Sequence, residues 1–454
     1  MHIREISLSS IKDLKAHILS RAPSIFTSSK TSTVIPYEKI KDFYADKDES
    51  FELSLVDISA LPQKMELLEN GNLSFWGGVT FEEARLFLRE KKRDLCVFPT
   101  EELASLVGGI STSATGERSF SFGPLRQQVK EVYLMNSNAE ILTLRDEVNL
   151  SDYFSQEQLT DDLSLLTAYQ KAFKPFNSFK NGPFPHFEKA THLAIGTEGQ
   201  LGVVLGGVLE TIPLKKTFCL AIELPRWEED NSLHLAIYER LQSKRDFVYC
   251  LEFIDWSSFE VSAFCLPGQK KETDFIFIEV LEEYYEDLFT KDLSTIEGIN
   301  LERIMELKKS DFDKWRKEVP RLVWEKNSKR GIIKKGTDIQ MPRGHLEKLF
   351  SFYREAKELG VESILFGHLG DAHLHFNFLP KDRKEEEICE KFLMALYQKV
   401  KQWNGSPFAE HGVGLIKQKY MSSFYTQTQR NFFSFLKKTF DPHAQFFPKG
   451  PMNL

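Results

Sequence analysis

The sequence predicts an α+β protein of two domains, and two observations lead to this fold class. The chain has 454 residues, 41% of them hydrophobic, which is enough for two buried cores. Beyond residue 216, strand-like segments occur at 218–224, 247–254, 261–266 and 274–280, with a helical run at 233–244 after the first. A strand–helix–strand–strand succession of this kind predicts an antiparallel sheet covered by helices.

The first sixty residues alternate between helical and extended patterns. Helices are expected at 11–21 and 37–47. Between them, residues 24–33 are mostly Ser and Thr, and we predict a loop there. Residues 51–59 alternate between polar and apolar side chains, as a half-buried strand does.

Two glycine-containing segments of this first half are candidates for ligand contact. Residues 108–116 combine glycine with small side chains, so the backbone can closely approach a flat or phosphorylated ligand. Residues 196–202 hold three glycines and one glutamate just before a buried strand. Ordinary turns are the alternative reading of both segments.

Composition excludes several classes of protein. The formal charge of −7 comes from 59 basic and 66 acidic residues, with no long basic arm, so no nucleic-acid partner is expected. The five cysteines contain no CxxC pair, which disfavours a thiolate metal centre and suits a reducing compartment. No apolar run spans a membrane, and the N-terminus lacks a signal-peptide core. The expected location is the cytoplasm, either free or peripheral at a membrane.

The stretch Gly367–Pro380, GHLGDAHLHFNFLP, is the strongest functional signal in the chain. Its alternation places His373, His375 and Asn377 on one face of a strand and three apolar side chains on the other. Because the apolar face can be buried, the polar face must meet hydrogen-bonding partners or a metal.

A second short stretch, Glu410-His411-Gly412-Val413-Gly414, adds a carboxylate and an imidazole, and His368 precedes the strand turn. Two or three His with one Glu is the ligand set of a Zn- or Mn-type site with an open position. The alternative is a group of hydrogen-bonded core histidines. Four of the 11 histidines lie in these two stretches, which favours a shared site.

Six segments together resemble the FAD-linked oxidases of the vanillyl-alcohol oxidase/PCMH superfamily, in particular the D-lactate dehydrogenase and glycolate oxidase subunit group. The resemblance covers roughly residues 52 to 450. The matching segments read GGISTSATGERSFSFG, GTEGQLGVV, WRKEVP with KKGTDIQMP, GHLGDAHLHFN, EHGVGLIKQKYM and FDPHAQFFPKG.

The resemblance implies three regions. These are a PCMH-type FAD-binding domain over 1–215, a cap domain with an antiparallel sheet over 216–405, and a C-terminal segment over 406–454 that completes the active site. One departure stands at the front. The family's glycine-rich pyrophosphate loop is expected to be deleted, with the first βαβ unit reduced, because no glycine precedes Gly71.

The implied reaction is oxidation of a D-2-hydroxy acid of the D-lactate, glycolate or 2-hydroxyglutarate type to the 2-oxo acid, by hydride transfer to FAD. A divalent metal, Zn or Mn, would bind the substrate hydroxyl, and His373 would orient a ligand of that metal. The implied cofactor contacts are Gly108, Gly109, Thr112, Gly116, Gly196, Glu198, Gly199 and Gly202. The implied metal ligands are His368, His375 and Glu410, with His411 as base, Asn377 orienting the substrate, and Arg316 with Lys334 or Lys335 binding its carboxylate.

Electrons would pass to a separate acceptor, a quinone or an electron-transfer protein, and a homodimer is a further expectation. Two other readings stay open. A degenerate relative without FAD would act as a metal- or metabolite-binding protein or a complex subunit, and a metal-dependent hydrolase would use the same His/Glu set.

Overall fold

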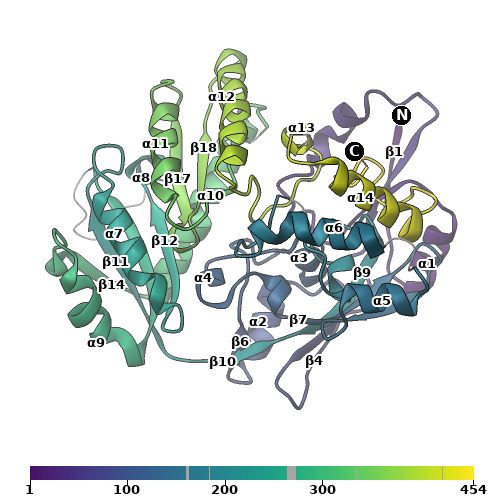
Figure 1. The fold of residues 1–454 in the computed structure, drawn as a ribbon, viewed down its shortest axis with the longest axis horizontal. Coiled ribbons are helices and arrows are strands. Elements are labelled where there is room, and N and C mark those ends of the chain that lie inside the picture. Colours follow the sequence, from purple (N-terminus) through teal and green to yellow (C-terminus); the bar gives the residue numbers. More distant parts are fainter. Residues whose placement is uncertain (160–162, 184, 263–271, 334, 422, 454) are drawn as a thin grey trace. The chain divides into compact units, whose positions relative to one another are not determined.

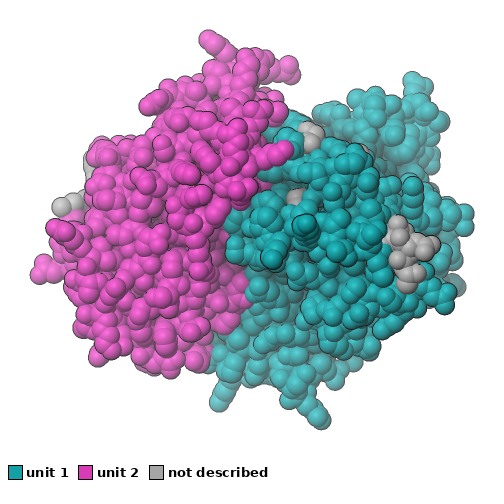
Figure 2. Space-filling view, viewed as in Figure 1, with its two compact units in different colours: residues 1–115, 124–214, 410–454 teal, residues 116–123, 215–409 magenta. Residues whose placement is uncertain are grey.

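A computed structural model of the chain describes residues 1–454 except 160–162, 184, 263–271, 334, 422 and 454 (Figure 1). The chain divides into two compact units, which are coloured separately in Figure 2. Unit 1 comprises residues 1–115, 124–214 and 410–454, and unit 2 comprises 116–123 and 215–409. Residues 116–123, which the sequence places in the first domain, thus group with the second unit.

Unit 1 begins with a parallel three-stranded sheet. Strand β1 (His2–Ser7) is followed by helix α1 (Ile11–Leu19), β2 (Ser24–Thr27), a 3-10 helix (Tyr37–Tyr44) and β3 (Glu52–Asp57). The order is β1-β3-β2, and both pairings are parallel. The α1 prediction is confirmed, whereas the second predicted helix is a 3-10 helix.

The prediction of a loop over 24–33 is wrong at its start, because Ser24–Thr27 forms β2. Its short run with apolar Ile25 was obscured by the surrounding hydroxyl residues, and only pairing with β3 reveals it. The arrangement β1–α1–β2 therefore precedes β3, and the expectation that the glycine-rich loop is deleted stays a prediction. Residues 28–33 occupy the connection that leaves β2, without any glycine.

The second sheet of unit 1 is antiparallel, in the order β4-β5-β9-β7-β8. Its strands are β4 (Lys64–Leu67), β5 (Leu73–Trp76), β7 (Val129–Met135), β8 (Ile141–Arg145) and β9 (Val203–Leu209), with a separate β6 (Arg93–Leu95) and β10 (Thr211–Pro213) pair. The helices of unit 1 that follow α1 are α2 (Phe81–Arg89), α3 (Leu106–Thr112), α5 (Leu150–Gln156), α6 (Leu163–Phe173), α13 (Gln418–Met421) and α14 (Gln427–Phe440).

Unit 2 is built on one large sheet in which every pairing is antiparallel, so the predicted antiparallel layer is confirmed. The order is β14-β11-β13-β12-β17-β18-β15, with β16 also on β18. The strands are β11 (Thr217–Leu224), β12 (Val248–Ile254), β13 (Asp274–Leu281), β14 (Ile304–Leu307), β15 (Lys335–Gly336), β16 (Ile339–Gln340), β17 (Ser363–His368) and β18 (His373–Phe378).

One predicted strand of unit 2 is wrong in its described part. Val261 and Ser262 end helix α8 (Trp256–Ser262), and residues 263–266 lie outside the described residues. Short helices α4 (Ser119–Phe122) and α9 (Tyr285–Asp287) complete the connections. In the described part of the chain, no helix has the length and apolarity needed to cross a lipid bilayer.

Helices lie against both faces of the unit 2 sheet. On one face, Phe253 of β12 contacts rings of α7 (Ser232–Leu241) and α11 (Leu346–Lys357), and α12 (Arg383–Gln402) packs on Phe378. On the other, Phe277 of β13 contacts rings of α10 (Lys309–Lys329). This second face also carries the histidines, because alternate residues of a strand point to the same side.

Candidate functional site

The three histidines of the signal stretch lie on two adjacent strands of unit 2. His368 ends β17 and faces His373 in the β17–β18 register, and His375 follows two residues along. The turn between the strands is closed at Ala372, which adopts a left-handed φ of 51°. All three side chains are buried, with exposed fractions of 5%, 0% and 5% for His368, His373 and His375. The predicted clustering is confirmed.

Each imidazole is held by a partner on a neighbouring element. His368 Nδ1 lies 2.9 Å from Glu252 Oε1, and His373 Nε2 lies 2.9 Å from Asp338 Oδ1. His375 Nδ1 lies 3.3 Å from the backbone oxygen of Thr337. Metal-bound histidines characteristically use one ring nitrogen in this way, which fixes the ring and leaves the other nitrogen for the metal.

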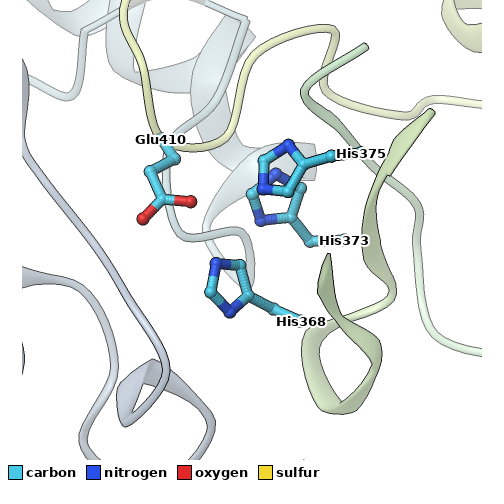
Figure 3. A group of neighbouring side chains, drawn as sticks. All are labelled: His368, His373, His375 and Glu410. Atoms are coloured by element: carbon cyan, nitrogen blue, oxygen red, sulfur yellow. The ribbon is translucent and has the colours of Figure 1, made fainter. Parts of the chain in front are cut away.

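Glu410 adds a carboxylate to this group, as Figure 3 shows. Glu410 directly follows Ala409, the last residue of unit 2. The Ala409 amide donates a 2.9 Å hydrogen bond to the backbone oxygen of Asp338. One ligand atom from each of the four residues lies within 4.8 Å of all the others. His373, expected only to orient a ligand, therefore stands among the potential ligands themselves.

His411, the predicted base, belongs to an overlapping group. Its side chain, with those of Asp338, His375 and Glu410, again brings one ligand atom each within 4.8 Å. His411 is the only partly buried member of this group. A histidine that retains access to water suits proton exchange better than one fully enclosed.

Asn377 lies two residues beyond His375 on the same face of β18. It is fully buried, and its Nδ2 donates a 3.1 Å hydrogen bond to the His375 backbone oxygen. Its Oδ1 atom is buried and has no hydrogen-bond partner among the described residues. A buried amide oxygen without a donor costs free energy, so this atom is suited to receive a hydrogen bond from a ligand.

The two predicted carboxylate-binding cations have carboxylate partners of their own. Arg316 of α10 forms an ion pair with Glu117, and both side chains are buried. Lys335 binds Glu386 at 2.9 Å and Glu390 at 2.6 Å, both on α12. The alternative candidate, Lys334, lies outside the described residues.

The two glycine segments of unit 1 meet, as expected for parts of one site. Gly196 N donates to Ile110 O at 3.1 Å, and Glu198 N donates to Ser111 O at 2.8 Å. Gly108, Gly109 and Thr112 lie within helix α3, so this segment is a helix rather than an open loop. Its predicted companion Gly116 falls in unit 2, where its oxygen accepts a hydrogen bond from Ser119 Oγ at 2.5 Å.

Several of these glycines have a visible packing reason. A Cβ on Gly109 would lie 2.6 Å from the Phe81 ring, and one on Gly202 would lie 2.6 Å from the Met135 backbone oxygen. Gly196 and Gly199 both have a φ of 72°, in the left-handed region that glycine tolerates. These positions shape the turns themselves, whatever ligand the turns contact.

Glu198 is bound to the C-terminal stretch of the same unit. Its two carboxylate oxygens accept hydrogen bonds of 2.8 Å from the amides of Val413 and Gly414. Burial raises the pKa of Glu198, and these amides act in the opposite direction. Glu198 therefore holds the turn that follows His411.

Four buried hydroxyls of unit 1 suggest that this region accommodates a large polar group. Ser28, Ser113, Thr115 and Thr191 each have a buried hydroxyl oxygen with no hydrogen-bond partner among the described residues. Ser28 directly follows β2, Ser113 and Thr115 follow α3, and Thr191 lies in the 3-10 helix Ala190–Leu193. Hydroxyl donors and acceptors of this kind fit FAD, which presents phosphates, ribityl hydroxyls and ring heteroatoms.

Sequence reasoning missed the supporting residues of the site. Glu252 lies far from the histidines in sequence, in a segment that shows no motif. Asp338 and Glu117 lie within two of the segments that carry the family resemblance, but they were assigned no role there. A charged residue at an inward position of a strand, as at Glu252 in β12, was the available signal. Ser28 was hidden in a hydroxyl-rich run with no glycine.

Comparison with known proteins agrees with this architecture. The family model for the C-terminal domain of FAD-linked oxidases matches residues 263–449. The solved structure of alkyldihydroxyacetonephosphate synthase superposes with a TM-score of 0.65 at 12% identity, over 98% of this chain and 76% of that one, which shows a shared fold.

Two curated enzymes match along most of the chain. The D-2-hydroxyglutarate–pyruvate transhydrogenase of Saccharomyces cerevisiae is 22% identical over 84% of this chain and 73% of its own length. The D-lactate dehydrogenase of Anaerostipes hadrus is 22% identical over 77% of this chain and 69% of its own. A D-2-hydroxyglutarate dehydrogenase of Stutzerimonas stutzeri matches 91 residues at 32% identity.

Together, these matches support an FAD-linked oxidase of the PCMH superfamily, with the family model covering residues 263–449. That relationship places it among the FAD-dependent oxidoreductases that act on CH–OH groups.

Proposed function

We propose that this protein oxidises a D-2-hydroxy acid to the corresponding 2-oxo acid. The observation that carries the proposal is the group of three buried histidines, each with its own carboxylate or carbonyl partner, beside Glu410. Buried polar groups of this kind are costly unless they bind something. The names of the relatives that match along most of the chain support a hydroxy acid as substrate.

In this proposal His368, His375 and Glu410 hold a divalent cation, Zn or Mn, and His373 supports them. Such a cation would lower the pKa of a bound alcohol by stabilising the alkoxide. Two imidazoles and one carboxylate leave a position open for the substrate. Zn and Mn both accept this mixed ligand set.

His411 is proposed to take the hydroxyl proton, because imidazole titrates near neutral pH. Asn377 Oδ1 would accept a hydrogen bond from the substrate and so orient it. The α-hydrogen leaves carbon as hydride with the bonding electron pair, while the proton goes to the base. The electron and proton balance of alcohol oxidation is then complete.

FAD would supply the acceptor of that hydride. The proposed contacts in unit 1 are the α3 segment with Gly108, Gly109 and Thr112, the turn with Gly196, Gly199 and Gly202, and the buried hydroxyls after β2 and α3. Glu198 supports this proposal indirectly, by fixing the turn that carries Gly412 and Gly414. Gly116 would contribute from the segment that follows Thr115.

A separate acceptor, a quinone or an electron-transfer protein, is proposed to reoxidise the flavin. A homodimer and a cytoplasmic location stay predictions.

One observation favours a second candidate function. Residues 28–33 contain no glycine, and backbone amides cradle phosphates most cheaply where glycine allows close approach. A relative that binds FAD weakly or not at all would retain a metal- or metabolite-binding role through the histidine cluster.

The visible spectrum of the purified protein, with flavin release on denaturation, separates these candidates. We expect oxidised-flavin absorption that bleaches anaerobically on addition of a D-2-hydroxy acid but not of its L-enantiomer. A colourless protein that takes up no added FAD contradicts the redox proposal. Metal analysis of the same sample then tests the binding role.

A further inference from the structure

The Arg316–Glu117 pair has a consequence for the substrate. The ion pair joins α10 to the segment before α4, and the side chains are 8% and 0% exposed. Lys309 Nζ also lies 3.8 Å from Glu117 Oε1. Glu117 is therefore a buried carboxylate directed at the arginine that the family resemblance assigns to the substrate carboxylate.

A second buried carboxylate completes this network. Glu279 of β13 accepts hydrogen bonds from Arg118 Nη2 at 2.9 Å and Nε at 3.2 Å, and Lys309 Nζ lies 3.4 Å away. Burial alone would raise the pKa of Glu279, but Arg118 and Lys309 hold it well below its usual range. Arg316, Arg118 and Lys309 are thus already paired with two carboxylates of the protein itself, Glu117 and Glu279.

The network carries no surplus positive charge. Lys309 also contacts Asp313 at 3.0 Å, so three cations face three carboxylates. A pocket that selects an anion normally presents an uncompensated cation to it. Here, an incoming carboxylate would have to displace Glu117 or lie beside it, and both are unfavourable.

This network and the histidine cluster share one face of the unit 2 sheet. The Trp315 ring of α10 contacts Phe277, and Phe277 lies opposite Glu252 in the β12–β13 register. Glu252 in turn holds His368. Directly opposed residues of an antiparallel pair point to the same side, so substrate bound at the histidines has α10 on the same face.

We propose that Glu117 is a specificity-determining residue that neutralises Arg316 and selects against substrates with a second carboxylate. The inference rests on the proposed function. In a 2-hydroxy acid the 1-carboxylate and the 2-hydroxyl are adjacent, so both would bind at the proposed divalent-metal site. In this proposal the 1-carboxylate therefore does not bind Arg316, contrary to what the family resemblance implies. In this proposal, the remainder of the substrate extends along the same sheet face toward α10 and is an uncharged group, as in a monocarboxylic 2-hydroxy acid.

Binding of the two product types tests this without turnover. The full chain, with its metal and flavin content measured, is titrated calorimetrically with pyruvate and with 2-oxoglutarate. In Glu117→Gln, we expect the Kd for 2-oxoglutarate to fall at least fivefold while that for pyruvate changes less than threefold. A smaller gain, or weaker binding of 2-oxoglutarate, overturns the proposal; weaker binding would mean that Glu117 positions Arg316 for the ligand.

Two further variants complete the test. Glu117→Gln/Arg316→Gln lacks the released cation, so its Kd for 2-oxoglutarate is expected within fivefold of native. A larger loss overturns the proposal even if the single variant does not fold, because Arg316 would then bind the acid in the native protein. The matched control Glu318→Gln removes one of the two carboxylate partners of exposed Arg321 on the same helix, and an equal gain there overturns the proposal by showing a general charge effect.

The outcome is separable from that of the proposed function. Oxidation of a D-2-hydroxy acid is measured independently by flavin bleaching. If the Kd shifts as predicted but no D-2-hydroxy acid bleaches the flavin, the inference about Glu117 is supported and the proposed reaction is contradicted. If a D-2-hydroxy acid bleaches the flavin but the Kd does not shift, the proposed reaction is supported and the inference about Glu117 is contradicted.

Discussion

The Nδ1 atom of His368 lies 2.9 Å from Glu252 Oε1, in a buried pair that joins the end of β17 to the middle of β12. The two residues are 116 positions apart in the chain. The carboxylate fixes the orientation of the ring and favours a proton on Nδ1, which leaves Nε2 as the candidate metal ligand.

Glu252→Gln should weaken divalent-metal binding about 10-fold or more, because partners of metal-bound histidines typically contribute 10–100-fold to affinity. The measurement is Zn competition against a chromophoric chelator. Glu306→Gln, at the exposed position of β14 in the same sheet, is the matched control and should bind metal as the native chain does. Native affinity in Glu252→Gln would contradict the metal assignment.

Asn377→Ala should lower kcat/KM about 10-fold, which corresponds to about 1.4 kcal/mol for one lost hydrogen bond to substrate. The unpartnered Oδ1 is the reason for this expectation. Steady-state kinetics with a D-2-hydroxy acid provide the test, with metal content measured in parallel. The exposed substitution Asn138→Ala serves as control. Unchanged kinetics in a well-folded Asn377→Ala protein would exclude a substrate contact.

Glu198→Gln should destabilise unit 1 by about 2–3 kcal/mol. Both carboxylate oxygens accept amide hydrogen bonds, and an amide side chain would turn one acceptor into a donor facing an N–H group. Urea unfolding followed by fluorescence measures the loss. Glu210→Gln, whose partly exposed side chain pairs with Lys130, should change stability by less than about 0.5 kcal/mol. Equal stability of the native and Glu198→Gln chains would show that these bonds are not needed.

Asp255 should make unit 2 less stable as the pH rises. Burial raises its pKa to about 7, Lys357 opposes that shift, and Asp274 adds to it. Between about pH 4 and pH 7, the folded state therefore keeps a proton on Asp255 that the unfolded state has lost. The contribution of Asp255 to the free energy of unfolding falls over this range by up to about 4 kcal/mol.

Asp255→Asn should remove this part of the pH dependence. The comparison is the difference in unfolding free energy between pH 4.5 and pH 8, measured for native protein and variant. Asp287→Asn, at a more exposed side chain paired with Lys291, should keep the native difference. If Asp255→Asn also retains it, Asp255 does not titrate in this range.

The sequence by itself determined the local pattern of the site and the class of fold. Alternation in HLHFNF placed His373, His375 and Asn377 on one strand face, because the period of a strand is two residues, and the structure has that strand as β18. The strand–helix–strand–strand order likewise predicted the antiparallel sheet of unit 2.

Only the tertiary structure decided which distant groups hold those side chains. Pairing with β3 turned four residues of a hydroxyl-rich segment into β2, because sheet hydrogen bonds outweigh weak local propensity. Strand order brought Glu252 to His368, and the packing of α10 brought Arg316 to Glu117. Local periodicity carries no information about such partners, since long-range ion pairs depend on which elements become neighbours.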